Sequence, residues 1–341
     1  MRKQLLLVLS LVLITSVSPE AQILFQEDFN YPAGDTIGAH GWTGFSSFVN
    51  PLSIATSGLI YSGYVQSGIG NSLRVRNNGQ DAYKDFAPDS TGNIYISFMV
   101  RIDSVKPGGD YFFAFLPPNN TSFYTARFYA KDSSGNVSFG VSKSTNPIVY
   151  SGPNYTLGTT YLIVIKYTFL AGGPQDDEVR LFIFSGAIPS TEPAPLIGPV
   201  TQAINDNVLG RVAIRQGSAT TAPTLNIDGM RVFKSWGWLV GVRPISTIAE
   251  QFSLSQNYPN PFNPNTNIRF SIPERGFVSL KVYDMLGKEV SSLVEGNYSI
   301  GTYEVNLDGK GLSSGAYIYR MSFTSESGKE YADTKKLMLV K

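Results

Sequence analysis

The sequence predicts an all-β protein, and three observations support this prediction. Gly (33) and Pro (20) are frequent among the 341 residues, and 13% of the residues are aromatic. Short runs that alternate apolar and polar residues recur along the chain, as they do in half-buried strands. No stretch has the 3.6-residue period of a long helix, so we expect antiparallel sheets rather than a parallel sheet with helical crossovers.

Residues 1–21 have the composition of a secretory signal peptide. Arg2 and Lys3 form a basic start, and residues 5–14 are almost wholly apolar. This run is shorter than the roughly twenty apolar residues that a membrane-spanning helix needs. We expect cleavage after Ala21 and, because the chain has no cysteine, no lipoprotein anchor. No other run is long and apolar enough to predict a membrane span.

Residues 22–240 contain about ten strand-like runs joined by turn residues. The clearest is 94–102, whose even positions are all apolar, whereas 161–169 is apolar on both faces and is therefore expected to lie centrally. Asp-Ser-Ser-Gly-Asn at 132–136 predicts a hairpin. Two antiparallel sheets packed face to face accommodate this pattern. The other predicted strands are 23–29, 59–65, 72–75, 111–116, 126–131, 137–143, 179–184, 210–215 and 225–233.

The last quarter of the chain, residues 253–341, begins with a proline-rich stretch at 257–264. Its three prolines fix φ and remove backbone donors, which favours an ordered, non-helical start. Alternating runs follow, and about seven short strands predict a small Ig-like β-sandwich. Residues 241–252 have no clear period and are expected to be a linker. The alternating runs lie at 267–272, 278–283, 301–305 and 314–320.

Residues 253–341 resemble the C-terminal sorting domains of type IX secretion substrates. The resemblance rests on a YPNPF-type start, a Y-D-x-x-G turn, an S-G-x-Y strand and a basic-apolar end. It implies partners, namely the type IX secretion machinery and its sortase-like protease. It also implies export through the periplasm to the outer cell surface or the extracellular space. The residues that carry it are Tyr258, Pro259, Asn260, Pro261, Phe262, Gly287, Gly315, Lys335 and Lys336.

The two ends of the larger region carry a second resemblance. A first strand that ends in Glu27-Asp28-Phe29 and a last strand at 226–232 are similar to those of laminin-G and concanavalin-like jelly rolls, in which these strands pair. The whole chain is thus expected to be a large antiparallel jelly-roll sandwich followed by a small Ig-like β-sandwich.

The second resemblance implies a structural Ca²⁺ held by Asp28 and Asp228, with Glu27 in reserve. Ca²⁺ needs several oxygen ligands, and backbone carbonyls would supply the others. Alternatively, these acids cap strand ends or pair with Arg74 or Arg231.

Composition excludes several classes of function. The formal net charge is +1, with 27 basic and 26 acidic residues and no basic block, so we expect neither nucleic acid nor an anionic membrane as a partner. His40 is the single histidine, and no G-x-S-x-G segment accompanies it. Without cysteine, a zinc site of His and Cys ligands is not expected. No E-x-D-x-E triplet of a jelly-roll glycosidase occurs, so we predict no catalytic residue.

The sequence therefore favours a secreted, non-enzymatic β-sandwich that binds a polysaccharide or adheres at the cell surface. The alternatives are a secreted polysaccharide-degrading enzyme of jelly-roll fold and a structural surface-layer component. Aromatic rings bind sugars, and Trp42, Tyr64 and Tyr124 are the predicted ligand-binding residues, with Trp42 expected to be exposed in its Gly-rich loop. Each aromatic taken singly is more often a core residue. The wider set of candidates adds Tyr61, Tyr129, Trp236 and Trp238.

Overall fold

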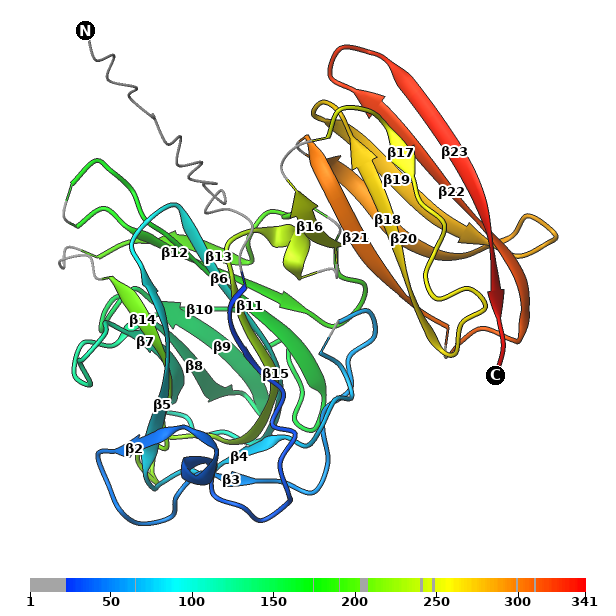
Figure 1. The fold of residues 1–341 in the computed structure, drawn as a ribbon. Coiled ribbons are helices and arrows are strands. Elements are labelled where there is room, and N and C mark those ends of the chain that lie inside the picture. The colour runs from blue at the N-terminus through cyan, green and yellow to red at the C-terminus, as the bar shows by residue number, and fades with distance from the viewer. Residues whose placement is uncertain are drawn as a thin grey trace, which may run out of the picture.

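The computed structural model describes residues 23–64, 66–173, 175–189, 191–202, 208–239, 242–246, 249–298, 300–309 and 311–341. The predicted signal peptide and its cleavage point lie outside these ranges. Within them, the regular structure is strand apart from short 3₁₀ helices at Ile37–His40 and Trp236–Trp238. Figure 1 shows the strands gathered into two separate sandwiches, which confirms the all-β prediction. In the described part of the chain, no helix has the length and hydropathy that crossing a membrane would require.

The larger sandwich is a jelly roll of two antiparallel sheets. Sheet 1 has the order β13-β12-β11-β6-β15-β4-β3, with β1 also beside β15. Its strands are β13 (Ile197–Val200), β12 (Glu178–Phe184), β11 (Thr160–Thr168), β6 (Asn93–Ser104), β15 (Thr224–Phe233), β4 (Leu73–Val75), β3 (Ser53–Ile54) and β1 (Ile23–Glu27).

Sheet 2 packs against sheet 1 and has the order β10-β9-β8-β7-β14-β5-β2. Its strands are β10 (Val149–Tyr150), β9 (Asn136–Ser142), β8 (Thr125–Ser133), β7 (Asp110–Leu116), β14 (Leu209–Ile214), β5 (Asp81–Asp89) and β2 (Thr43–Phe45). The 132–136 hairpin joins β8 to β9 as predicted.

The pairing of β1 with β15 confirms that the first and last strands of the jelly roll are neighbours. Phe25 lies opposite Val232, and Glu27 lies opposite Met230. On the same side of β15, residues 225–227 pair with β4. The partner of β15 thus changes from β4 to β1 around Gly229, whose φ of +56° favours glycine.

The core between the sheets follows the alternation of the sequence. Along β6, Ile96 and Phe98 are fully buried between the two sheets. Tyr95 and Met99 point the other way and belong to a second apolar cluster, in which Tyr61 and Tyr64 pack on the outer face of sheet 1. The loop between β3 and β4, which carries Tyr61 and Tyr64, therefore packs on that outer face through its aromatic residues.

The smaller sandwich consists of two four-stranded antiparallel sheets, as expected for a small β-sandwich. Their orders are β16-β21-β18-β17 and β20-β19-β22-β23. The strands of the first sheet are β16 (Val242–Ser246), β21 (Gly301–Asp308), β18 (Asn265–Ile272) and β17 (Ser253–Leu254). Those of the second are β20 (Glu289–Tyr298), β19 (Gly276–Tyr283), β22 (Gly315–Ser325) and β23 (Glu330–Leu339).

The prediction that residues 241–252 are a linker is wrong for their first half. Strand β16 pairs with β21, and Val242 is buried in the core of the small sandwich. The segment is too short to show a period, so its sequence gave no sign of the strand. The small sandwich thus begins by residue 242.

Candidate functional site

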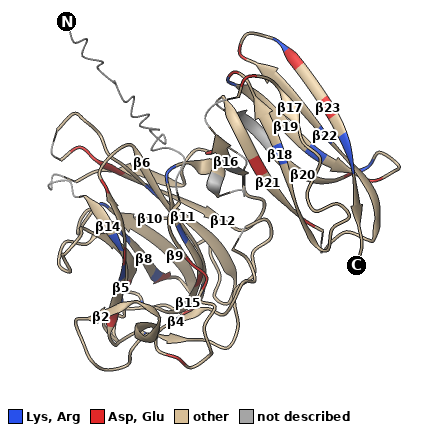
Figure 2. Cartoon of the chain, viewed as in Figure 1, with Lys and Arg blue, Asp and Glu red and all other residues tan. Residues whose placement is uncertain are grey.

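The outer face of sheet 2 gathers tyrosine and basic side chains from several strands. Figure 2 shows acidic and basic residues scattered over the rest of the molecule without a block of one sign. We call this surface the tyrosine–arginine face. It comprises Tyr111, Tyr124, Arg127, Tyr129, Lys131, Tyr150 and Arg215.

Strand β8 positions the centre of this face through its period of two. Phe128 and Ala130 point into the core and are fully buried. Arg127, Tyr129 and Lys131 occupy the alternate positions and therefore point outward. The apolar residues fix the register of β8, and this register places Arg127, Tyr129 and Lys131 on the outer face of the sheet.

A row of aromatic rings crosses the face from strand to strand. Tyr129 pairs with Tyr111 on β7 and with Gly140 on β9, and Gly140 pairs with Tyr150 on β10. The ring centroids are 5.5 Å apart for Tyr111–Tyr129 and 6.2 Å apart for Tyr129–Tyr150. Tyr124 adds a fourth ring, 5.4 Å from Tyr111. A Cβ at Gly140 would lie only 2.6 Å from the Tyr150 ring, so glycine is needed there.

Three cations lie on these rings. The Arg127 guanidinium is 4.7 Å from the ring centroid of Tyr111 and 5.4 Å from that of Tyr124. Lys131 Nζ is 3.9 Å from the centroid of Tyr150. Each is within the range of a cation–π contact. Among the described residues, no carboxylate lies within the 4.0 Å of an ion pair from Arg127 or Lys131, so both charges are available to an anion.

Arg215 is the third cation, and its charge is compensated. Its Nη1 lies 2.7 Å from Asp110 Oδ1, and its guanidinium lies 4.3 Å from the ring centroid of Tyr111. Tyr111 therefore contacts two guanidinium groups, from Arg215 and Arg127.

These surroundings act on the acidities of the two tyrosines beside Arg127. Burial raises the pKa of Tyr111, but Arg215 and Arg127 both act to lower it. Burial raises the pKa of Tyr124 as well, and the Tyr111 and Asp81 side chains raise it further. The pKa of each tyrosine is raised overall, and Arg215 and Arg127 act against that rise at both, so both phenols are proton donors at neutral pH.

A loop at 117–124 carries Tyr124 over the face, and Arg211 anchors it. Arg211 Nη1 donates to the carbonyl of Asn120 at 3.1 Å, while its Nε pairs with Asp85 at 2.6 Å. The same guanidinium lies 4.0 Å from the ring centroid of Tyr83. The position of Tyr124 is thus set by an ion pair on the neighbouring strands rather than by β8 alone.

The prediction that Trp42 is an exposed ligand-binding residue is wrong. Trp42 is 3% exposed and packs edge-on against Phe25 in the core. Its indole nitrogen donates to Glu27 Oε2 at 3.0 Å. The Gly-rich loop folds the indole inward because Glu27 supplies the buried partner that its N–H requires.

Tyr64 is also buried, so its ring is not accessible to a sugar. It is 4% exposed, and its hydroxyl donates to the carbonyl of Gly229 at 2.6 Å and lies 2.8 Å from Ser97 Oγ. Tyr61 and Trp236 are buried as well, and the side chain of Trp238 lies outside those described. Of the predicted residues, Tyr124 reaches the tyrosine–arginine face, where the wider candidate Tyr129 joins it.

Asp28 and Asp228 come together where the partner of β15 changes. Asp228 is fully buried, and its two oxygens accept the backbone N–H groups of Leu59 and Gly229, each at 2.7 Å. Asp28 Oδ2 accepts from the Gln26 side chain at 3.1 Å, whereas Asp28 Oδ1 is buried and has no hydrogen-bond partner. Burial raises the pKa of Asp228 to about 8 and raises that of Asp28 too.

Backbone carbonyls approach this pair of carboxylates. A Cβ on Gly58 would lie 2.8 Å from the carbonyl oxygen of Gly70 and 3.1 Å from Asp228 Oδ2. A Cβ on Gly70 would lie 2.7 Å from the carbonyl oxygen of Asp28. In the described ranges, no group of three or more Asp, Glu or His side chains could hold a metal. The orphaned Asp28 oxygen and these carbonyls are oxygen donors, the ligand type that Ca²⁺ prefers.

Glu27 and Arg74 do not take part. Glu27 accepts from Lys84 Nζ at 2.7 Å, from Trp42 and from the backbone of Phe29, so it is not a spare metal ligand. Arg74 pairs with Asp103 rather than with either aspartate, whereas the charge of Arg231 acts to lower the pKa of Asp28, so the alternative of a pairing with Arg231 stays open.

The predicted sorting residues occupy structural positions in the small sandwich. Phe262 is buried, its N–H donates to Met338 O at 2.9 Å, and its carbonyl accepts from Val340 at 3.0 Å. Asn260 Oδ1 also accepts from the backbone of Met338. Tyr258, in contrast, is 81% exposed. The YPNPF segment thus hydrogen-bonds to the last strand of the small sandwich and leaves the Tyr258 ring exposed to solvent.

The remaining sorting residues lie at turns and on β23. Gly287 has a φ of +83° in the turn between β19 and β20, and Gly315 has a φ of +155° at the start of β22. Lys335 and Lys336 lie on β23, and Lys336 O accepts from the Gln256 side chain at 2.7 Å. The two glycines occupy backbone conformations that other residues adopt rarely.

Comparison with known proteins confirms the sorting domain. Residues 256–339 match the secretion system C-terminal sorting domain family. This domain implies contact with the secretion machinery and export to the cell surface or the extracellular space. No curated protein matches the chain.

Several solved structures are similar to part of this chain at low sequence identity. The alginate lyase Aly36B, in complex with alginate trisaccharide, is 15% identical with a TM-score of 0.42, over 64% of this chain and 99% of that chain. Domain 4 of AbnA, an extracellular arabinanase from Geobacillus stearothermophilus, in complex with arabinotriose, is 12% identical with a TM-score of 0.33, over 65% and 97%. Trypanosoma rangeli sialidase is 11% identical with a TM-score of 0.34, over 61% and 34%.

These comparisons correct the expectation of a non-enzymatic adhesive protein. The similar structures include those of a lyase and a sialidase. The tyrosine–arginine face was not predicted, because its residues come from several strands rather than from one strand or one motif. The Arg127-Tyr129-Lys131 alternation was the available signal, since alternate residues of one strand lie on the same face. The narrower laminin-G and concanavalin-like labels remain predictions.

Proposed function

We propose that the larger sandwich is a secreted enzyme that degrades an acidic polysaccharide at the tyrosine–arginine face. The observation that carries the proposal is the pair of available cations, Arg127 and Lys131, set among tyrosine rings. Pyranose rings stack on tyrosine, and a guanidinium binds a carboxylate through two parallel hydrogen bonds. A uronate-containing polymer meets both requirements, whereas a neutral glycan would leave the cations unused.

β-Elimination is the reaction that suits these groups. Arg127 binds the uronate carboxylate and stabilises the charge that develops when the proton on C5 is removed. Tyr111 takes that proton in its ionised form. Burial raises the pKa of Tyr111 and the two guanidiniums beside it act against that rise, so the ionised form and the reaction are expected at alkaline pH. The C4–C5 double bond forms as the C4–O4 bond breaks, and Tyr124 donates its proton to the departing oxygen. Lys131 binds a carboxylate further along the polymer, beside Tyr150.

Hydrolysis by two carboxylates has less support on this face. Asp110 and Asp85 are both paired with arginines, at 2.7 and 2.6 Å. Burial raises the pKa of Asp81, but its Oδ1 accepts from the backbone of Gln216. A hydrolase needs one carboxylate that is free to act on water or on the sugar.

The test is an incubation of the exported chain with alginate, pectate and a neutral arabinan. Ultraviolet absorbance detects the unsaturated uronate that elimination produces, and reducing-end release detects any cleavage. We expect both signals on an acidic polymer and neither on arabinan. Reducing ends without absorbance would identify a hydrolase, and no cleavage of any polymer would refute the proposal.

We also propose that Asp28 and Asp228 hold a structural Ca²⁺ ion. The support is the orphaned Asp28 oxygen, the fully buried Asp228 carboxyl and the carbonyls that approach them. The ion would supply no chemistry to the reaction, because it would lie beside β15 in sheet 1 rather than on sheet 2.

A further proposal concerns the sortase-like protease. Because β16 belongs to the small sandwich, we propose that cleavage occurs on the amino-terminal side of Val242, which would release the sorting domain whole. Mass spectrometry of the secreted protein tests this. A carboxyl terminus after residue 246 would contradict it.

A further inference from the structure

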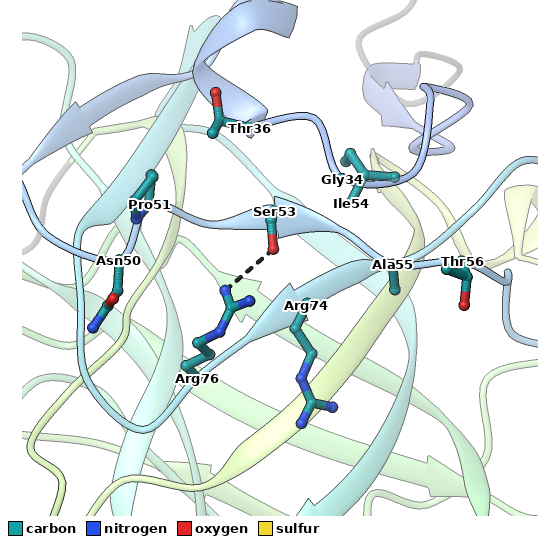
Figure 3. Close-up of a pocket in the computed structure, with 10 residues that line it drawn as sticks. All are labelled: Gly34, Thr36, Asn50, Pro51, Ser53, Ile54, Ala55, Thr56, Arg74 and Arg76. Carbon is teal, nitrogen blue, oxygen red and sulfur yellow. Dashed lines mark hydrogen bonds between the residues drawn. The ribbon is translucent and has the colours of Figure 1, made fainter.

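A second basic site lies at the edge of sheet 1, away from the tyrosine–arginine face. A pocket of about 660 Å³ is bounded by β3, β4 and the loops that precede β3. Figure 3 shows the Arg76 side chain rising toward Ser53, with Asn50 on one side and Arg74 on the other. Nothing in the proposed reaction uses these residues.

Arg76 is exposed, and its charge is not matched within the described structure. Its Nη1 donates to Ser53 Oγ at 3.1 Å. No described carboxylate lies within the 4.0 Å of an ion pair from it. One neutral contact holds the guanidinium in place and leaves most of its donors for a ligand.

The surrounding charges add to this imbalance. Arg74 and Arg101 share one carboxylate, that of Asp103. Arg76, two residues after Arg74, adds a third guanidinium, for which no described carboxylate is a partner. Arg74 is further fixed by Asn226 Oδ1 at 2.9 Å, so its position is set before any ligand arrives.

The other groups in the pocket suit a sugar. Thr36, Asn50 and Thr56 line it with exposed hydroxyl and amide side chains that can bond to ring hydroxyls. The pocket is wide enough for a few sugar units and has no deep apolar floor. An acidic sugar unit supplies both the anion and the hydroxyls that such a site would bind.

We propose that this pocket is a second, non-catalytic binding site for an acidic oligosaccharide, with Arg76 as its principal contact. The inference goes beyond the proposed reaction, because the pocket would hold acidic polymer whether or not the other sheet cleaves it. The anion that Arg76 binds is a carboxylate or a sulfate ester. Both groups carry a negative charge and offer at least two acceptor oxygens to a guanidinium.

Isothermal titration calorimetry on the full exported chain tests the proposal. The protein carries Tyr111→Phe to slow turnover, and the probes are an alginate, a sulfated galactan and a neutral arabinan oligosaccharide. We expect two sites for an acidic probe, and one site when Arg76→Ala is added. Arg76→Lys should weaken the second site by about tenfold or more, because lysine keeps the charge but loses the paired hydrogen bonds. Arabinan should not bind there, and the stronger acidic probe identifies the anion.

Two controls separate this site from the proposed reaction. Arg275→Ala removes the same charge from an exposed arginine of the small sandwich and should leave binding unchanged. Arg127→Ala should remove the other site and keep the Arg76 site. If polymer cleavage fails but Arg76→Ala still removes one site, the inference stands without the enzyme. An unchanged stoichiometry and affinity in Arg76→Ala, with an unaltered melting temperature, overturns it, as does equal weakening by Arg275→Ala.

Discussion

The linkage between pH and Ca²⁺ at Asp228 gives the most demanding test of the structure. Burial raises the pKa of Asp228 from 3.8 to about 8 in the folded protein. Between these values the folded protein keeps a proton that the unfolded chain releases. Without metal, the free energy of unfolding therefore falls as pH rises through this window and levels off above the folded pKa. A shift of about four pKa units corresponds to an upper limit of about 5 kcal/mol.

Calcium should reverse this loss, because it binds the ionised carboxylate in place of the proton. We expect the melting temperature with Ca²⁺ to exceed that with chelator by little near about pH 5 and by most above about pH 8. Differential scanning calorimetry of the exported chain across this range measures both effects. Asp228→Asn is the control, since it removes the titration and the ligand charge while keeping the size of the side chain.

Two results would refute the reasoning. A melting temperature that falls with pH but ignores Ca²⁺ at every pH would leave Asp228 as a neutral buried acid without a metal. A calcium effect that persists in Asp228→Asn would place the ion elsewhere.

Three further predictions concern other parts of the molecule. Tyr124→Phe should lower turnover of an acidic polymer about a hundredfold with little change in melting temperature, because it removes only the proton donor. An unchanged rate in this variant would reject Tyr124 as the donor. With Tyr111 as the base, the rate of cleavage should rise with pH on the alkaline side. Glu27→Gln should destabilise the jelly roll by about 3 kcal/mol in urea unfolding, since Lys84 loses its buried partner, and a loss below about 1 kcal/mol would show that the network is dispensable. Asn257→Ala should cost the small sandwich about 2 kcal/mol, because its side chain bonds Thr266 Oγ1 and Pro259 O; thermal unfolding measures this, with exposed Asn306→Ala as the comparison.

The fold could be predicted from sequence because local periodicity and burial agree along each strand. In β6 the even positions face the core, and the alternation alone identifies them. The strand β16 could not be predicted, since five residues do not establish a period and its partner β21 lies far along the chain. The direction of Trp42 was missed for a related reason. Its loop is glycine-rich, as exposed loops are, but Glu27, fifteen positions earlier, provides the buried acceptor that turns the indole inward.

The candidate site depends even more on contacts between distant strands. Tyr111, Arg127 and Arg215 meet through the order β8-β7-β14, in which β14 follows β8 in sequence by a long interval. No spacing in the sequence encodes that order. The proximity of Asp28 and Asp228 could be predicted, because the sequence predicts that the first and last strands pair, and this pairing brings the two ends of the jelly roll together.

The sorting signature is a feature of a folded domain rather than of a linear segment. Phe262 exchanges backbone hydrogen bonds with residues on either side of Leu339, and the backbone N–H of Asn257 donates to the Tyr319 hydroxyl on β22. These contacts form only when the last strand is in place, so the prolines and asparagines of the signature complete the sandwich that presents Tyr258. We therefore expect recognition by the secretion machinery to depend on the stability of the small sandwich as well as on the residues that it exposes. In a chain without cysteine, that stability comes from core burial and from these buried hydrogen bonds.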